Sequence, residues 1–162
     1  NIVNYSPTLL KLMGIEIAES LITQDHYCPE QRLWRHVLLN AVEDTRILQS
    51  DRKSSIHKME AHQWITRENK DFNWICWQSG WDPEIVKEQY FKAVRTGHIT
   101  FTHRQLKWIE YYRLYLDLKK EANEDKRKVL RKKVEKLRKQ VLATTTAIVK
   151  NLISKPNLLP CV

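Results

Sequence analysis

Apolar residues recur along this chain at spacings of three and four, which is the period of an amphipathic helix. After Pro29 they form one stripe that we expect to be the buried face of a helix. The stripe consists of Trp34, Val37, Leu38, Ala41, Thr45 and Leu48. A second helix, capped by Ser54 or Ser55, would end before the polar break "RENKD". Its expected apolar residues are Ile56, Met59 and Trp64.

Sequence signals for helix ends divide the region that follows. Asp71 is expected to open a short helix that stops at Gly80, because a left-handed backbone costs glycine least. Asp82 as the cap and Pro83 at the first helical position would start the next helix. Thr102 would cap a further helix.

The composition also favours helices, since only 3 glycines and 5 prolines among 162 residues leave little material for tight turns. We therefore predict an all-α protein, a compact helical bundle with a helix-turn-helix-like centre and a long basic C-terminal helical hairpin or arm. The predicted division is a helical domain over residues 1–101, which includes the helix-turn-helix-like unit over 71–95, then long helices over 102–155 and a tail over 156–162.

The segment around Gly80 has the spacing of a helix-turn-helix unit. Ile75 and Cys76 supply the apolar and small residues of the first helix, and Val86 lies where the second helix is pinned to it. The later pinning position falls on Gln89 instead of an apolar residue. Similar helix pairs form corners of structural bundles, so both interpretations stay open.

If this unit reads DNA, its second helix would carry the side chains that contact bases. Lysine, arginine and glutamine donate to base edges in the major groove, whereas Glu84 and Glu88 would repel phosphates. The candidate base-reading residues are Lys87, Gln89, Lys92 and Arg95.

The stretches "LWRHVLLNAVEDTRI" and "AHQWITRENKDFNWICWQSGWDPEIV" contain a Leu-Trp helix, an Ala-x-x-Trp helix, and then Asp-Phe and Gly-x-Asp-Pro elements. On these motifs, residues 33–94 resemble small helical proteins encoded in bacterial phages, prophages and gene-transfer elements. The resemblance implies a mobile-element gene and a nucleoprotein setting, and it assigns no catalytic residue.

The net charge of the chain is concentrated in "KRKVLRKKVEKLRK", residues 126–139. This stretch has nine basic residues and one acidic residue of the chain's 28 and 19, which leaves 19 basic and 18 acidic residues elsewhere. Such local charge favours contacts with the phosphates of DNA or RNA. The candidate contacts are Lys126, Arg127, Lys128, Arg131, Lys132, Lys133, Lys136, Arg138 and Lys139.

Two other interpretations of the basic stretch are a solvated outer face beside an apolar seam and a helix lying on a membrane surface. Bulky aromatic residues, which favour membrane surfaces, are absent from its apolar face. No aromatic residue follows Tyr115, so base stacking by this stretch is not expected.

Apolar residues within and after the basic stretch follow a heptad spacing, with Thr144 as a polar member. This seam could pair with a second copy of the chain, or fold back on a helix that contains Leu106, Ile109 and Leu116. Asn123, followed by two acidic residues, indicates a helix restart, so we prefer two helices to one continuous rod. The candidate oligomer seam is Leu130, Val134, Leu137, Val141 and Ile148.

The sequence offers no pattern typical of catalysis, so we predict no enzyme, no cofactor and no metal site. His57 and His62 are five residues apart and do not share a helical face as zinc-hydrolase ligands do. Cys28, Cys76 and Cys161 are distant from one another and odd in number, which argues against a disulfide framework. A reducing location, cytoplasmic or nucleoid-associated, is the expectation. No apolar run approaches the length of a membrane span, so no membrane partner is expected.

Two functions are compatible with these patterns. The first is a DNA-binding regulatory or accessory protein of a phage or mobile element. The second is a protein-interaction or assembly module, virion-associated or otherwise, that binds a protein partner or another copy of itself. Exposed tryptophans between residues 74 and 81 would favour a protein contact there.

Overall fold

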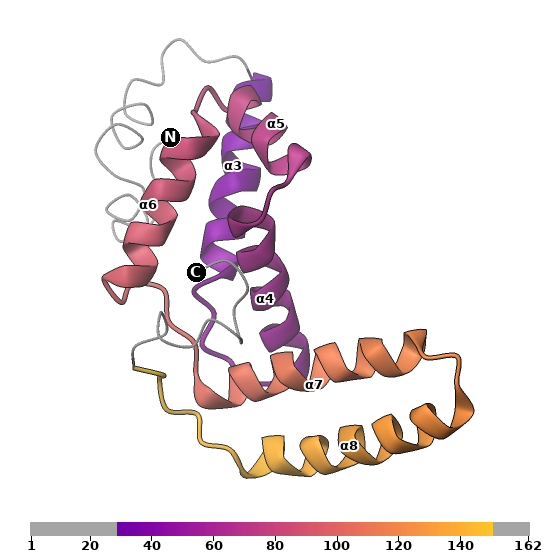
Figure 1. The fold of residues 1–162 in the computed structure, drawn as a ribbon. Coiled ribbons are helices and arrows are strands. Elements are labelled where there is room, and N and C mark those ends of the chain that lie inside the picture. The colour runs from indigo at the N-terminus through magenta and orange to yellow at the C-terminus, as the bar shows by residue number, and fades with distance from the viewer. Residues whose placement is uncertain (1–28, 151–162) are drawn as a thin grey trace. The chain divides into compact units, whose positions relative to one another are not determined.

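Residues 29–150, which the computed structural model describes, contain six α-helices and no β-strand, so the predicted all-α fold is confirmed for this part of the chain (Figure 1). The helices are α3 (Pro29–Asp44), α4 (Arg52–Thr66), α5 (Lys70–Gln78), α6 (Pro83–Arg95), α7 (His103–Lys120) and α8 (Glu124–Ala143). None of these helices is both long and apolar enough to cross a lipid bilayer. The predicted tail over 156–162, together with Cys28 and Cys161, lies outside the described residues.

The described residues belong to two compact units. Unit 1 contains residues 29–46 and 61–99, and unit 2 contains residues 47–60 and 100–150. Residues 47–60 are therefore grouped with the C-terminal helices in unit 2.

The buried face of α3 in unit 1 differs from the predicted stripe. Leu38 is fully buried as expected, but Leu39 and Val42 are also buried, while Leu48 is 54% exposed. The helix ends at Asp44, so Leu48 cannot continue its buried face. Arg35 is buried as well, and its Nε donates a hydrogen bond to the Ser79 carbonyl at 2.8 Å.

Two predicted helix starts lie a few residues too late. Asn69, not Asp71, caps α5, and its side chain accepts hydrogen bonds from backbone N–H groups of the first turn. Likewise, the Asp51 carboxylate accepts the backbone N–H of Ser54 at the start of α4, while Ser55 is buried inside the first turn. In both cases an acidic or amide side chain upstream reaches the free N–H groups first.

The turn between α5 and α6 follows the prediction closely. Gly80 has φ +77°, a left-handed conformation. A Cβ atom there would meet the flexible end of the Gln31 side chain, which can move aside, so the turn requires glycine for its backbone conformation. Asp82 caps α6 by accepting the Glu84 N–H at 2.9 Å, and Pro83 occupies the first helical turn.

A buried lysine holds residues 47–60 within unit 2. The Nζ atom of Lys58 donates to the carbonyls of Ile47, at 2.6 Å, and Thr100, and to Oε1 of Gln105 at 3.1 Å. Gln105 Nε2 donates in turn to the carbonyls of Ile47 and Gln49, at 2.8 and 2.9 Å. These contacts give hydrogen-bond donors to the loop carbonyls of Ile47, Gln49 and Thr100.

The predicted break between two C-terminal helices is present. Thr102 caps α7 in a capping box with Gln105, as the Thr-x-x-Gln spacing permits. The helix ends at Lys120, and Asn123 caps α8 by accepting the N–H groups of Asp125 and Lys126. Residues 103–143 therefore form two helices and not one rod.

α7 and α8 run antiparallel as a helical hairpin in unit 2 (Figure 1). The end opposite the turn is tied by hydrogen bonds. Arg104 Nε donates to the Thr144 carbonyl at 2.9 Å, and the backbone N–H of Val149 donates to the Phe101 carbonyl at 2.8 Å. The hairpin is thus closed at both ends.

Candidate nucleic-acid interface

The first turn of α8 sets the orientation of the basic helix. Glu124 and Asp125 occupy this turn, where negative charge is favourable at the positive end of the helix dipole. The basic residues begin immediately afterwards at Lys126. The acidic start therefore stabilises the helix, while the nearly four turns that follow carry the positive charge.

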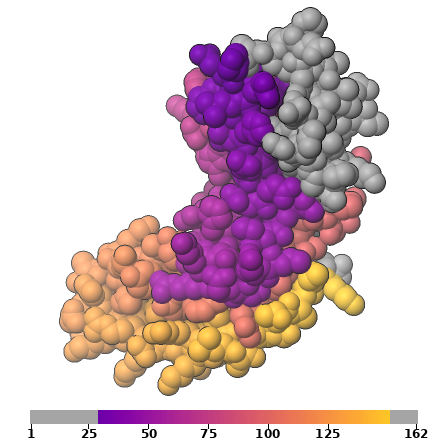
Figure 2. All heavy atoms as spheres, turned by 180° about the vertical axis from the view of Figure 1, so that it is seen from behind, coloured from indigo at the N-terminus to yellow at the C-terminus, as the bar shows by residue number. Residues whose placement is uncertain are grey.

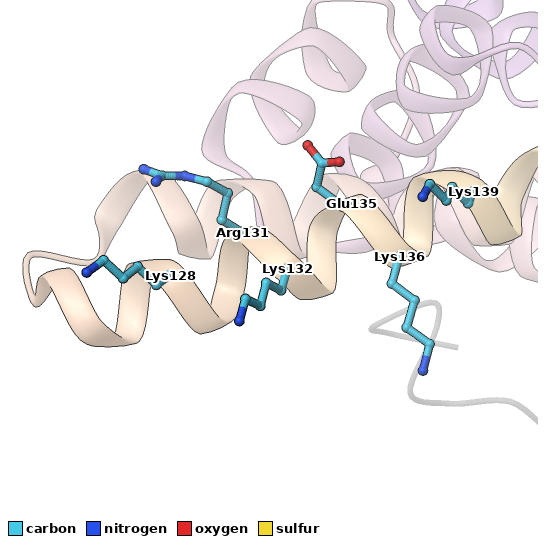
Figure 3. Close-up of a pocket in the computed structure, with 6 residues that line it drawn as sticks. All are labelled: Lys128, Arg131, Lys132, Glu135, Lys136 and Lys139. Carbon is cyan, nitrogen blue, oxygen red and sulfur yellow. The ribbon is translucent and has the colours of Figure 1, made fainter.

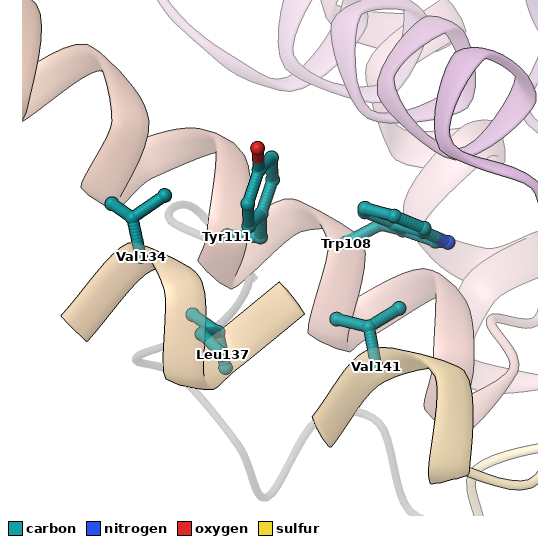
Figure 4. Packing of buried hydrophobic residues seen from close by; sticks show 5 residues of the cluster. All are labelled: Trp108, Tyr111, Val134, Leu137 and Val141. Atoms are coloured by element: carbon teal, nitrogen blue, oxygen red, sulfur yellow. The ribbon is translucent and has the colours of Figure 1, made fainter. Parts of the chain in front are cut away.

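The apolar seam of α8 faces α7 within the same chain. Val134, Leu137 and Val141 are buried and pack against Trp108 and Tyr111 of α7 (Figure 4). Partly buried residues complete the cluster, namely Leu114, Tyr115 and Leu118. The seam therefore folds back on α7, which is one of the two arrangements that its spacing allowed.

One residue of the predicted seam is misplaced. Ile148 does not continue it, because α8 ends at Ala143 and Ile148 is 50% exposed beyond the helix. The helix that receives the seam is the one that contains Leu106 and Ile109, although the cluster includes neither of them. Both of these residues are buried elsewhere in the fold. The three buried seam residues are already used inside the hairpin, so they are not free to bind a second copy.

Because the apolar face of α8 is turned to α7, the basic side chains point away from it. Eight of the nine are exposed and Arg127 is half-buried. In the space-filling view, side chains of α8, coloured orange to yellow, project from the surface (Figure 2). Within the described part of the chain, none of the nine forms a salt bridge. Their charge is therefore available to an external anion.

The basic residues are distributed around the exposed circumference of α8. A surface hollow of about 630 Å³ runs along the helix, and Glu135 is the single acid among its described lining residues. Lys132 and Lys136 point to one side of the helix, whereas Arg131 and Glu135 project from the neighbouring side (Figure 3). The hollow is lined by Lys128, Arg131, Lys132, Glu135, Lys136 and Lys139.

Unit 2 carries the positive charge of the described residues. It contains 18 basic and 8 acidic side chains, whereas unit 1 contains 8 of each. Outside α8, Arg52 lies 5.2 Å from the ring centroid of Tyr111, and Lys119 lies 4.9 Å from that of Tyr115. Neither of these two exposed cations was among the predicted contacts. The spacing of four between Tyr115 and Lys119 could have indicated the second pair, but the first depends on tertiary structure.

The candidate base-reading residues of α6 are not all on its exposed side. Lys87 is only 8% exposed, and its Nζ lies 5.6 Å from the ring centroid of Phe72, so its expected exposure is wrong. Gln89 is half-buried, while Lys92 and Arg95 are exposed. The first turns of α6 present acidic side chains outward, which leaves two exposed cations near its end.

The tryptophans near the α5–α6 turn divide into exposed and buried side chains. Trp74 and Trp77 of α5 are 49% and 61% exposed, while Trp81 is buried beneath the Arg35 guanidinium at 5.0 Å. Trp74 also meets Trp34 edge to face at 4.9 Å between centroids. Unit 1 thus presents an exposed aromatic surface on α3 and α5.

Two of the side chains that could take part in catalysis, those of Cys76 and His62, are buried. Burial raises the pKa of the Cys76 thiol to about 12, which disfavours the nucleophilic thiolate. His62 is buried and its Nδ1 lies 2.7 Å from the hydroxyl of Tyr90, whereas His57 is exposed. Among residues 29–150, His, Cys, Asp and Glu side chains form no group of three suited to a metal ion.

No family model, no curated protein and no solved structure matches this chain.

Proposed function

We propose that this chain is a non-enzymatic nucleic-acid-binding protein that contacts phosphates through α8. The observation that carries the proposal is the set of exposed basic side chains on α8 that make no salt bridge within the described residues. A basic helix that stabilised the fold through its charges would direct them at internal acids. A cluster directed outward instead favours phosphates, because their neutralisation releases condensed counterions.

We further propose that α5 and α6 form a helix-turn-helix-like unit that assists this binding. The positive φ of Gly80 and the complete burial of Cys76 and Val86 support it. With Lys87 buried, only Lys92 and Arg95 on α6 are fully exposed cations, so α8 supplies most of the affinity in this proposal. The chain also resembles phage and gene-transfer-element proteins. We therefore propose that it acts in association with DNA, as an accessory or regulatory protein.

The test is binding of a random-sequence DNA duplex, measured by fluorescence anisotropy across a salt series. The α8-glutamine variant replaces six exposed cations. We expect it to reduce the slope of log affinity against log salt by several units, at about 0.9 per phosphate contact. The variant consists of R131Q, K132Q, K133Q, K136Q, R138Q and K139Q.

A control neutralises exposed cations of unit 1 outside α6 and consists of R32Q, R67Q and K70Q. The proposal expects a slope within about one unit of the original protein for this control. Unchanged binding by the α8-glutamine variant would refute phosphate contact by α8. A large loss in the control alone would move the interface to unit 1.

The second candidate function is a protein-interaction module, and the exposure of Trp74 and Trp77 favours it. Large exposed aromatic side chains are typical of protein interfaces. The double variant W74A/W77A separates the two functions, because it should leave the DNA salt dependence unchanged if α8 alone binds nucleic acid. Absence of DNA binding at low salt in the original protein would favour the protein-interaction function.

A further inference from the structure

The sides of α8 on which the cations lie indicate the shape of the anionic surface that the helix binds. The seam residues Leu130, Val134, Leu137 and Val141 lie within a stripe about 60° wide at 100° per residue. The remaining circumference is exposed and carries cations on three sides. A helix that rests on a flat anionic surface needs cations on one side only.

The three sides can be assigned from the helical geometry. The outer lysines lie opposite the seam, the first flank lies to one side of the seam, and the second flank lies to the other. The side chains that define these sides are exposed except for Arg127. The outer lysines are Lys128, Lys132, Lys136 and Lys139; the first flank is Arg127, Arg131 and Arg138; the second flank is Lys126 and Lys133.

From this arrangement we infer that α8 lies in the major groove of B-form DNA. This inference rests on the proposed function and adds the type of nucleic acid and the mode of contact. The groove is roughly 12 Å wide and admits one α-helix with its side chains. The two flanks then face the phosphates of the two strands, while the outer lysines face base edges. The narrow seam leaves α8 packed on α7, as recognition helices remain packed on a supporting helix.

One uncharged residue borders the outer lysines of α8. Val129 is 53% exposed and lies about 20° from Lys136 around the helix at 100° per residue. In the major groove Val129 can contact the C5-methyl group of thymine, while the outer lysines can donate to guanine. Gln140 is exposed on the second flank, about 20° from Lys133.

A-form RNA provides a strict comparison, because its major groove is too deep and narrow for side chains to read. We therefore compare a DNA duplex with an RNA duplex of the same sequence at one salt concentration. A third duplex carries glucosylated hydroxymethyl groups at C5 of its cytosines, which fill the major groove. We expect both alternatives to bind at least about tenfold more weakly than plain DNA, which is about 1.4 kcal/mol.

Two variants test the flanks separately, R131Q/R138Q and K126Q/K133Q. Groove insertion predicts that each lowers the salt slope by about two units, since each flank faces its own strand. An effect confined to one variant, or equal affinity for the three duplexes, would overturn groove insertion and leave phosphate binding by α8 intact. Binding to none of the duplexes at low salt would overturn the proposed function as well.

Discussion

At the scale of single residues, the least expected feature is the buried ammonium group of Lys58. Its three acceptors match the three N–H groups, and its removal leaves the Thr100 carbonyl without a donor among the described residues. We expect Lys58→Met to reduce the free energy of unfolding by about 1–3 kcal/mol. Urea denaturation measures this, and Lys53→Met, an exposed neighbour on α4, should change it little. Equal stabilities of the two variants would contradict a structural role for Lys58.

The same residue predicts a pH dependence. Burial lowers the pKa of Lys58 to about 7 from 10.5, so above pH 7 the folded protein releases a proton that the unfolded chain keeps. The free energy of unfolding therefore rises as the pH increases above about 7. Between pH 6.5 and 8.5, the unfolding free energy should increase by about 2 kcal/mol more in the original protein than in Lys58→Met. If the unfolding free energies of the original protein and Lys58→Met differ by the same amount at every pH in this range, the three acceptors keep Lys58 charged throughout it.

Sequence patterns could not reveal which polar residues are buried. Lys58 and Lys87 lie in polar-rich helices, and composition gives each the high exposure usual for lysine. Their burial depends on partners distant in sequence, such as the Thr100 carbonyl 42 residues away. The small and apolar positions of the helix-turn-helix pattern were easier to foresee, because Cys76 and Val86 need only a local spacing to be buried.

At the scale of elements, the hairpin of α7 and α8 depends on one apolar stripe in a helix that is otherwise highly charged. Leu137 is 7% exposed in the cluster with Trp108, while Leu142 is 67% exposed. We expect Leu137→Ala to reduce the free energy of unfolding by about 2–3 kcal/mol, through lost burial and the cavity it leaves. Leu142→Ala is the matched control and should cost less than about 0.5 kcal/mol. Equal losses in urea denaturation would show that the seam is not the stabilising contact.

Three of the predicted helix starts are confirmed, those of α6, α7 and α8. Thr102, Asn123 and Asp82 act as caps where local spacing placed them, because a cap needs only its own first turn. The sequence did not decide whether the α8 seam packs on α7 or on a second copy of the chain. The spacing of one helix cannot choose between them, and the face of α7 that meets it is set by aromatic packing around Trp108 and Tyr111.

At the scale of the whole molecule, the question is whether binding follows the net charge or its location. Unit 1 is balanced, with 8 basic and 8 acidic side chains, and unit 2 holds an excess of ten positive charges among the described residues. A general attraction of a basic protein to DNA would depend on the total of +9. The proposed interface depends mainly on the cations of α8.

A variant with relocated charge separates these possibilities. The α8-glutamine variant loses six positive charges, and the exposed unit 1 substitutions E30K, E68K and E88K restore six, so the net charge stays at +9. Because counterion release depends on cations close to the phosphates, we expect affinity for a DNA duplex to fall at least about tenfold at constant salt. Circular dichroism checks that helix content is kept. Affinity restored to that of the original protein would mean that net charge, wherever it lies, is sufficient, and both α8 as the interface and its insertion in the groove would then be wrong.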